Sequence, residues 1–254
     1  MSGRLAIIGI GPGDRRYLTR EAEDALAEAD ALYGYGPYLD RVPARTGQVR
    51  HESDNREEGM RAEAALRHAA AGARVAIVSG GDPGVFAMAA SVCEAIEHGP
   101  DAWRAIEIAI VPGITAMLAV AARAGAPLGH DFCALSLSDN LKPWELIERR
   151  LDAAAAAGFV IALYNPVSRA RPWQLAKALA LLARHLPGDT PVIFGRAIGR
   201  PDESVTVATL AAAPSIAADM ASLIIVGSHE TRVVARAGSS PLVYTPRAAE
   251  SVKA

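Results

Sequence analysis

The stretch at positions 4–14, Arg-Leu-Ala-Ile-Ile-Gly-Ile-Gly-Pro-Gly-Asp, constrains the fold more than any other part of the chain. Leu5 to Ile8 form an apolar run with the length of one buried strand. Glycine then occupies every second position, so the backbone can turn sharply and approach another group where a Cβ would interfere. Thr19, a plausible helix N-cap, precedes apolar residues at helical spacing. Strand, glycine turn and helix together predict the start of an α/β domain.

Two nucleotide-binding motifs are close to this turn, and the sequence fails both. A dinucleotide fingerprint needs a third glycine at the sixth position counted from Gly9, where this chain has the carboxylate of Asp14. A Walker loop needs Gly-Lys-Ser or Gly-Lys-Thr, which occurs nowhere in the sequence. A tight turn that binds no ligand stays open as the simpler alternative for this stretch.

Composition narrows the class of protein and of ligand. The chain has 254 residues with a net charge of −2, so it lacks the basic field that drives nucleic-acid binding, and a small-molecule ligand is expected. Cys93 and Cys133 lack metal-ligand spacing, which favours core positions in a reducing compartment and predicts no metal site. No apolar run is long enough to span a bilayer, so we expect a cytoplasmic protein without a membrane partner.

Hydrophobic patterns predict two domains. Up to Arg123, strands and helices alternate, which is typical of parallel βαβ units. The helix-stopping stretch 124–129 sets the expected boundary, giving an N-terminal α/β domain over 1–126 and a mixed α+β domain over 127–254. The expected strands are 5–8, 31–33, 75–78, 106–111, 132–137, 159–163, 191–194, 204–209, 223–226 and 242–244. The expected helices are 19–29, 60–71, 86–96, 115–123, 144–156 and 173–185.

Gly/Pro-rich loops follow three strands of the first half, at 11–14, 79–86 and 112–116. Because the carboxyl ends of parallel strands share one edge of a sheet, we expect these loops to form a site. For Asp82 or Thr115 taken singly, a helix cap is an equally good interpretation. The second half has its own special exits at 164–169, 195–200 and 227–228, which predict a ligand between the domains if the two sets face each other.

The motifs Gly9–Asp14, Ser79–Gly84, Val111–Ala116 and Tyr164–Pro166 resemble, in order and over nearly the whole chain, those of the tetrapyrrole methylases. This family uses S-adenosylmethionine and releases S-adenosylhomocysteine. The stretches 33–38, 79–88, 136–144 and 164–168 resemble the branch that methylates and contracts a precorrin ring in cobalamin synthesis. The resemblance implies two α/β domains with the active site in the cleft between them, a tetrapyrrole substrate and a homodimer. Other precorrin methylases, including those acting on cobalt-containing substrates, stay open as alternatives.

The resemblance also assigns site residues by position. The implied cofactor contacts are Pro12, Gly80, Gly81, Asp82, Val85, Thr115, Ala116, Asn165 and Ala197. Many relatives carry Met where this chain has Asn165, so that contact must differ in kind. The implied substrate-binding residues are Gly11, Gly13, Arg15, Lys142, Arg169 and Arg196, the cations serving as clamps for a polycarboxylate. A solvated surface charge is the simpler interpretation for most of these cations.

The chemistry implied by the resemblance has two parts. Methyl transfer from a sulfonium needs in-line positioning rather than a protein nucleophile, and the sequence has no Ser-His-Asp signature. Contraction of the ring needs a base and a proton donor. Asp14 is the preferred base, and Tyr35 and Ser138 complete the expected catalytic set. Further candidates for these acid and base roles are Asp82, Tyr38, His130, Asp139 and Glu203.

Two other classes of protein compete with this interpretation. A nicotinamide oxidoreductase would use the first glycine turn for pyrophosphate, but it also needs an acid after the second strand, where the chain has Gly34-Tyr35. A non-catalytic tetrapyrrole-binding module would bind the ring without a methyl donor.

Overall fold

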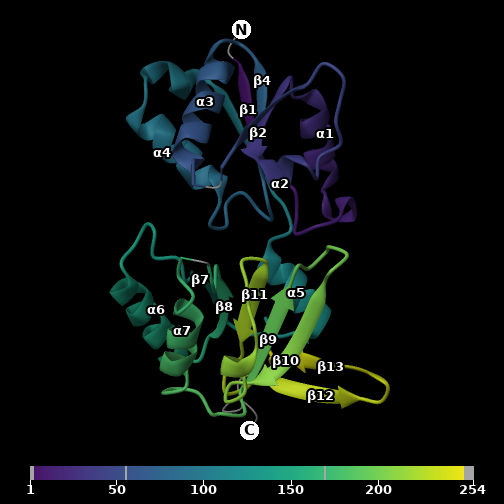
Figure 1. Ribbon diagram of the computed structural model, residues 1–254, viewed down its shortest axis with the longest axis vertical. Helices are drawn as coiled ribbons and strands as arrows, with labels where there is room; N and C mark the ends of the chain where they lie inside the picture. Colours follow the sequence, from purple (N-terminus) through teal and green to yellow (C-terminus); the bar gives the residue numbers. More distant parts are fainter. Residues whose placement is uncertain (1–2, 55, 169, 249–254) are drawn as a thin grey trace. The chain divides into compact units, whose positions relative to one another are not determined.

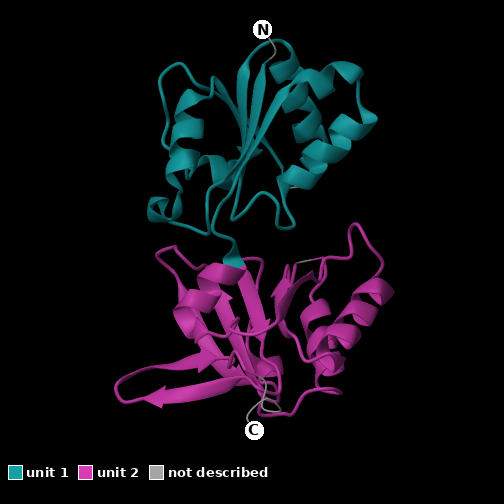
Figure 2. Cartoon of the chain, turned by 180° about the vertical axis from the view of Figure 1, so that it is seen from behind, with its two compact units in different colours: residues 1–116 teal, residues 117–254 magenta. Residues whose placement is uncertain are grey.

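The computed structural model describes residues 3–54, 56–168 and 170–248, and the chain divides into two compact units, residues 1–116 and 117–254 (Figure 2). The division falls at the start of helix α5 (Ala116–Ala124), earlier than the expected boundary at 126. Helix α5 packs with the second unit because its Val120 covers Gly195 on that unit's sheet. A Cβ on Gly195 would lie 2.3 Å from Val120 Cγ2.

The first unit is a parallel sheet covered by helices. Its strands lie in the order β3-β2-β4-β1-β5, and every pair is parallel. The strands are β1 Arg4–Gly9, β2 Ala31–Tyr35, β3 Val49–Ser53, β4 Arg74–Ser79 and β5 Glu107–Val111. The helices are α1 Arg20–Glu28, α2 Gly36–Leu39, α3 Glu58–Ala70 and α4 Met88–His98, with 3-10 turns η1 Arg15–Tyr17 and η2 Asp101–Ala105.

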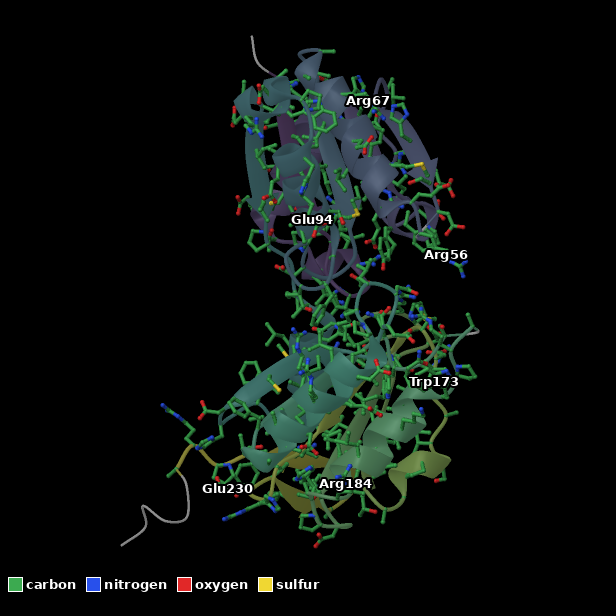
Figure 3. All side chains as sticks on the ribbon, turned by 90° about the vertical axis from the view of Figure 1, so that its left-hand side faces the viewer. Arg56, Arg67, Glu94, Trp173, Arg184 and Glu230 are labelled. Carbon is green, nitrogen blue, oxygen red and sulfur yellow. The ribbon has the colours of Figure 1, made fainter. Side chains whose placement is uncertain are left out.

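Alternate residues of these strands fill two cores, one on each face of the sheet. Ile7 and Ile77 pack in one core with Leu66 of α3, while Ile8 packs in the other with Leu26 of α1. Helices α3 and α4 therefore cover one face and α1 the other (Figure 1). Burial on both faces explains why the inner strands are apolar throughout. Charged side chains such as those of Arg67 and Glu94 lie on the outer surface of the helices (Figure 3).

The second unit has a mixed sheet in the order β10-β9-β11-β8-β7 and a three-stranded sheet β12-β13-β6. Strands β7 and β8 are parallel, and β11 runs antiparallel to both β8 and β9. The strands are β6 Gly125–Ala126, β7 Phe132–Ser136, β8 Val160–Tyr164, β9 Pro191–Arg196, β10 Ser204–Thr209, β11 Ser222–Val226, β12 Arg232–Arg236 and β13 Ser239–Tyr244. Helices α6 Trp144–Ala156 and α7 Gln174–Leu182 pack on the larger sheet, and η3 Ala213–Ser215 is a 3-10 turn.

The predicted α/β fold, with a parallel sheet in the first half and a mixed sheet in the second, is confirmed. Thr19 caps α1 as expected, its hydroxyl accepting a hydrogen bond from the Ala22 nitrogen at 3.1 Å. The sequence missed β3, whose residues form no apolar run, and β12, whose apolar run is only three residues long between two arginines. Helix α4 begins at Met88, later than expected, because Phe86 has a φ of +52°, which an α-helix does not contain. Within the described ranges, no helix is long and apolar enough to cross a membrane.

We predict that Gly113→Ala destabilises the first unit by about 2 kcal/mol or more, because overpacked positions force backbone shifts. A Cβ at Gly113 would lie 2.2 Å from the Gly81 carbonyl oxygen. Urea unfolding measures the loss. The matched control is Gly59→Ala in α3, where a Cβ would meet nothing within 4 Å and helix propensity favours alanine. Equal unfolding midpoints for the two variants would contradict this prediction.

Candidate functional site

The loops after β1, β4 and β5 pack backbone against backbone at one edge of the first sheet. The Ile10 nitrogen donates to the Ser79 carbonyl at 2.9 Å, and Gly11 and Gly81 exchange two hydrogen bonds of 3.1 and 2.9 Å. A Cβ on Gly9 would lie 2.7 Å from the nitrogen of Gly113 and 2.8 Å from the oxygen of Gly81. We call these three packed loops, residues 10–14, 80–87 and 112–115, the glycine frame. Their convergence at the carboxyl edge of the sheet agrees with the expectation for this half of the chain.

Asp82 ties two of these loops together. One carboxylate oxygen accepts from the Gly84 nitrogen at 2.8 Å, and the other accepts from the Gly113 nitrogen at 3.0 Å. Helix α4 begins after Ala87 and has no side-chain cap, so the alternative of Asp82 as a helix cap is wrong. Both carboxylate oxygens thus hold the backbone of the glycine frame in place.

Several expected cofactor contacts lie together within the frame. A Cβ on Gly81 would lie 3.7 Å from Thr115 Cα and 3.9 Å from the Ala116 nitrogen, so these three residues are neighbours. Gly80 lies against Tyr38, whose Cζ would be 2.6 Å from a Cβ at that position. Pro12 and Val85 belong to the same loops, and both are half-buried.

The expected acid, base and clamp residues of the first unit already have partners. Asp14 caps η1, accepting from the Arg16 nitrogen at 2.8 Å, and its side chain is half exposed. Arg15 pairs with Glu23 at 3.0 Å on the surface. Tyr35, at the end of β2, makes an edge-to-face contact with the ring of Tyr38 at 5.4 Å between centroids. Asp14 follows β1 and Tyr35 ends β2, so both belong to the carboxyl ends of strands in the same sheet.

The second unit also gathers candidate residues at one strand edge. Because β8 and β9 both pair antiparallel with β11, their carboxyl ends lie at the same edge, together with that of β7. Asn165 and Ala197, which directly follow β8 and β9, have φ values of +51° and +49°. A left-handed conformation at a residue with a Cβ costs about 1–2 kcal/mol, and such strain concentrates at functional sites. Helix α5 begins at this edge too, since the Met117 nitrogen donates to the Tyr164 hydroxyl at 3.1 Å.

A polar network joins the loops after β7 and β8. The Asn165 amide donates to the Ser136 hydroxyl at 3.0 Å, which also accepts from the Ser138 nitrogen at 3.3 Å. Arg171 donates to the Ser138 hydroxyl and forms an ion pair with Asp139. The hydrogen bond from Arg171 holds the pKa of the Asp139 carboxyl below its ordinary value. Ser138, expected to be catalytic, therefore sits in a braced segment beside Asn165.

The remaining cations differ in their environment. Arg196 pairs with Asp202 at 2.9 Å and Asp219 at 2.8 Å, and these hydrogen bonds raise the pKa of its guanidinium. Lys142 is half-buried, and burial, followed by the nearby charge of Arg150, lowers the pKa of its ammonium. Arg169 lies outside the described residues. Their binding roles stay predictions, as does the position of the ligand between the two halves.

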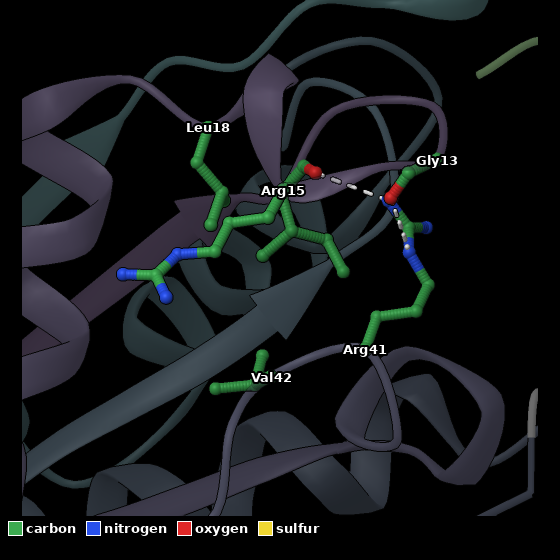
Figure 4. A pocket seen from close by; sticks show the side chains of 6 residues that line it. Gly13, Arg15, Leu18, Arg41 and Val42 are labelled. Carbon is green, nitrogen blue, oxygen red and sulfur yellow. Dashed lines mark hydrogen bonds between the residues drawn. The ribbon is translucent and has the colours of Figure 1, made fainter. Parts of the chain in front are cut away.

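Sequence reasoning missed Arg41, which follows α2 and reaches the first glycine turn (Figure 4). Its guanidinium donates hydrogen bonds to backbone carbonyls of that turn. Arg41 also lines a small pocket together with Ile10, Gly13, Arg15, Leu18 and Val42. An arginine whose partners are carbonyls distant in sequence leaves no local pattern. Among the described residues, no group of three or more His, Cys, Asp or Glu side chains is arranged to hold a metal ion.

Known proteins match this chain over most of its length. The family model for Tetrapyrrole (Corrin/Porphyrin) Methylases matches residues 4–214. A precorrin-3B C(17)-methyltransferase from Sinorhizobium sp is 62% identical over 247 residues, which cover 97% of this chain and 97% of that protein.

Two solved structures resemble the fold. The crystal structure of the methyltransferase CobJ has a TM-score of 0.89 and 47% identity, covering 96% of this chain and all of that one (100%). A uroporphyrin-III C-methyltransferase from Thermus thermophilus, solved in complex with S-adenosylhomocysteine, has a TM-score of 0.67 and 25% identity. That match covers 89% of this chain and 97% of the other.

We predict that the Asp139–Arg171 pair stabilises the second unit by about 1 kcal/mol at neutral pH and that acid removes this contribution. Because the folded pKa of Asp139 lies below its unfolded value, the contribution is complete above about pH 5 and disappears as the pH falls through the folded pKa. Urea unfolding of Asp139→Asn against the unsubstituted protein, between neutral and acidic pH, measures it. The control is Asp189→Asn, an exposed loop residue of the same unit. A difference that persists unchanged at acidic pH would refute the assignment.

Proposed function

The chain belongs to the tetrapyrrole methylase family, and from this membership we propose that it methylates C-17 of precorrin-3B and contracts the macrocycle to precorrin-4 in cobalamin synthesis. It is a methyltransferase, with relatives in cobalamin biosynthesis. The observation that carries the choice of substrate is the 62% identity to a precorrin-3B C(17)-methyltransferase over 97% of both chains. This identity favours the metal-free substrate over cobalt-containing alternatives.

S-adenosylmethionine is the proposed methyl donor, supplying an electrophilic methyl group on its sulfonium. The residues present suit such a cofactor, because Gly81 leaves a Cβ-free surface beside the backbone of Thr115 and Ala116. The left-handed backbone of Asn165 offers a further contact that does not depend on side-chain type. At Ala197 the nitrogen and the carbonyl are already bonded to Ala221 and Arg200, so a contact there would be by packing. The Asn165 amide is bonded to Ser136, which supports a backbone rather than a side-chain contact at this position.

The main catalytic task of the chain is positioning. An in-line methyl transfer is accelerated when donor and nucleophilic carbon are held ~3 Å apart in line, and a rigid backbone supports this positioning. The glycine frame has this rigidity because Asp82 and the Gly11–Gly81 pair fix its loops.

Contraction also needs proton transfer, for which Asp14 is the proposed base. Its side chain is half exposed, and the Arg16 backbone nitrogen and guanidinium both lie on Oδ1, which supports a ligand contact at Oδ2. Tyr35 and Ser138 are the proposed partners in this acid–base chemistry.

The proposed setting is a homodimer in the cytoplasm. Cys93 and Cys133 are both free thiols, which suits a reducing compartment. Cys93 is exposed, so the expected core position is wrong for it, while burial raises the pKa of the Cys133 thiol. One chain has a mass of 26.5 kDa, so light scattering of the purified protein distinguishes a monomer from a dimer of twice that mass.

The test is to incubate the purified protein with precorrin-3B and S-adenosylmethionine and to follow product mass and visible spectrum. We expect a product with one additional methyl group and the spectrum of a contracted ring. Parallel incubation with cobalt-factor III measures the preference for the metal-free ring. Calorimetry with S-adenosylhomocysteine against NADH separates a methyltransferase from an oxidoreductase. Binding of precorrin-3B without methylation would leave only a tetrapyrrole-binding module and refute the proposal.

We predict that Asp14→Asn abolishes the contracted product while S-adenosylhomocysteine still binds. Asparagine keeps the oxygen that accepts from the Arg16 nitrogen, so the turn is preserved while the base is lost. Calorimetry and product spectra measure the two effects. Asp24→Asn, an exposed carboxylate on α1, serves as the control with unchanged turnover. Full formation of contracted product by Asp14→Asn would assign the base to another residue.

A further inference from the structure

The region after β2 connects to the glycine frame through Arg41. The Arg41 guanidinium donates four hydrogen bonds to three carbonyls of the first loop. Nη2 reaches the carbonyls of Ile10 at 3.1 Å, Gly11 at 2.8 Å and Gly13 at 2.9 Å, and Nε reaches Gly13 at 3.2 Å. Charge-assisted hydrogen bonds of this kind are the stronger ones in proteins, and the planar guanidinium fixes their directions. The loop is therefore held from outside by a side chain distant in sequence.

A second arginine fixes the segment that carries Arg41. Arg50, on β3, donates to the carbonyls of Leu39 at 2.9 Å and of Val42 and Pro43 at 2.8 Å each. The edge strand β3 thus anchors residues 39–43, and these residues in turn present Arg41 to the glycine loop. Tyr38, directly before these residues, packs against Gly80, so residues 38–43 support two of the three loops of the frame.

The two ends of the first loop are held by different interactions. Arg41 contacts both ends, but the Gly11 end has a second anchor, because Gly11 also pairs with Gly81, the neighbour of Thr115 and Ala116 on the proposed cofactor side. Gly13 is bonded to Arg41 and leads into Asp14 and Arg15, which are proposed to act on the tetrapyrrole. Figure 4 shows Arg41 bonded to Gly13 while the side chain of Arg15 points away from it.

From this geometry we infer that Arg41 is a positioning residue, which holds Gly13 and Asp14 where the tetrapyrrole reacts without itself supporting cofactor binding; the inference rests on the function proposed above. Removing the guanidinium frees the Gly13 end of the loop while the Gly11–Gly81 pair persists. The expected consequence is selective damage to substrate handling, since small displacements of reacting groups are costly.

The experiment compares Arg41→Gln and Arg41→Lys with the unsubstituted protein. For Arg41→Gln we expect kcat/KM for precorrin-3B to fall ~10-fold or more, the effect of losing one charge-assisted hydrogen bond. The dissociation constant of S-adenosylhomocysteine, measured by calorimetry on the same variant, should change by less than about threefold. Arg41→Lys keeps the charge but not the fork, so its kcat/KM should lie between the two.

The matched control is Arg74→Gln. Arg74 is bonded to Asp30 and is the first residue of β4, so it lies at the amino ends of the strands, away from the glycine frame. It should leave both constants unchanged. Equal losses of cofactor and substrate affinity in Arg41→Gln would indicate general loosening and overturn the inference. Full activity of Arg41→Lys would overturn it too, because charge rather than geometry would then suffice.

Hydrogen–deuterium exchange separates this inference from the proposed function. In Arg41→Gln, the amides of residues 13–16 should exchange faster while those of 80–82 keep their protection. Unchanged exchange at 13–16 would refute the positioning role. If the unsubstituted protein does not methylate precorrin-3B, the proposed function fails, and the exchange result still decides on the role of Arg41.

Discussion

The close approach of three backbones at the edge of the first sheet is the constraint on which the candidate site depends. A Cβ on Gly113 would lie 2.2 Å from the Gly81 oxygen, so no other residue lets these loops meet without a shift. Only at this separation can Asp82 reach both its own loop and the Gly113 nitrogen. The glycines therefore do more than allow turns. They let the first two loops exchange backbone hydrogen bonds and bring the third within reach of the Asp82 carboxylate.

The second unit builds its edge by a different physical means. Its loops are braced by side chains, with Ser136 between Asn165 and Ser138, and with Arg171 between Ser138 and Asp139. These bonds hold Asn165 in a left-handed conformation that its Cβ disfavours. Strain of this kind persists only where surrounding contacts fix it, and the network supplies those contacts. A glycine at 165 would adopt the same backbone without strain, but it could not donate to Ser136.

Sequence alone predicted the inner strands and the glycine loops because their signals are local. Leu5–Ile8 and Val75–Val78 are apolar as strands buried on both faces must be. Strand β3 was missed because Val-Arg-His-Glu-Ser, at the edge of the sheet, carries no such pattern. The role of Asp82 was mistaken in part, since its partner Gly113 is remote in sequence. Arg41 and Arg171 share this property: their partners become neighbours only when the chain folds.

The number of arginines is a poor guide to which of them would bind an acidic substrate, because several already bind groups of the chain itself. Arg15 and Arg196 pair with carboxylates of the chain, while Arg41 and Arg50 bind backbone carbonyls. The carbonyl contacts still bear on an acidic ligand. A carbonyl oxygen repels a carboxylate, and the Arg41 guanidinium offsets the partial negative charge of the three carbonyls that it binds. Arginines bound to backbone can therefore change the electrostatics of a loop without offering a free cation to a ligand.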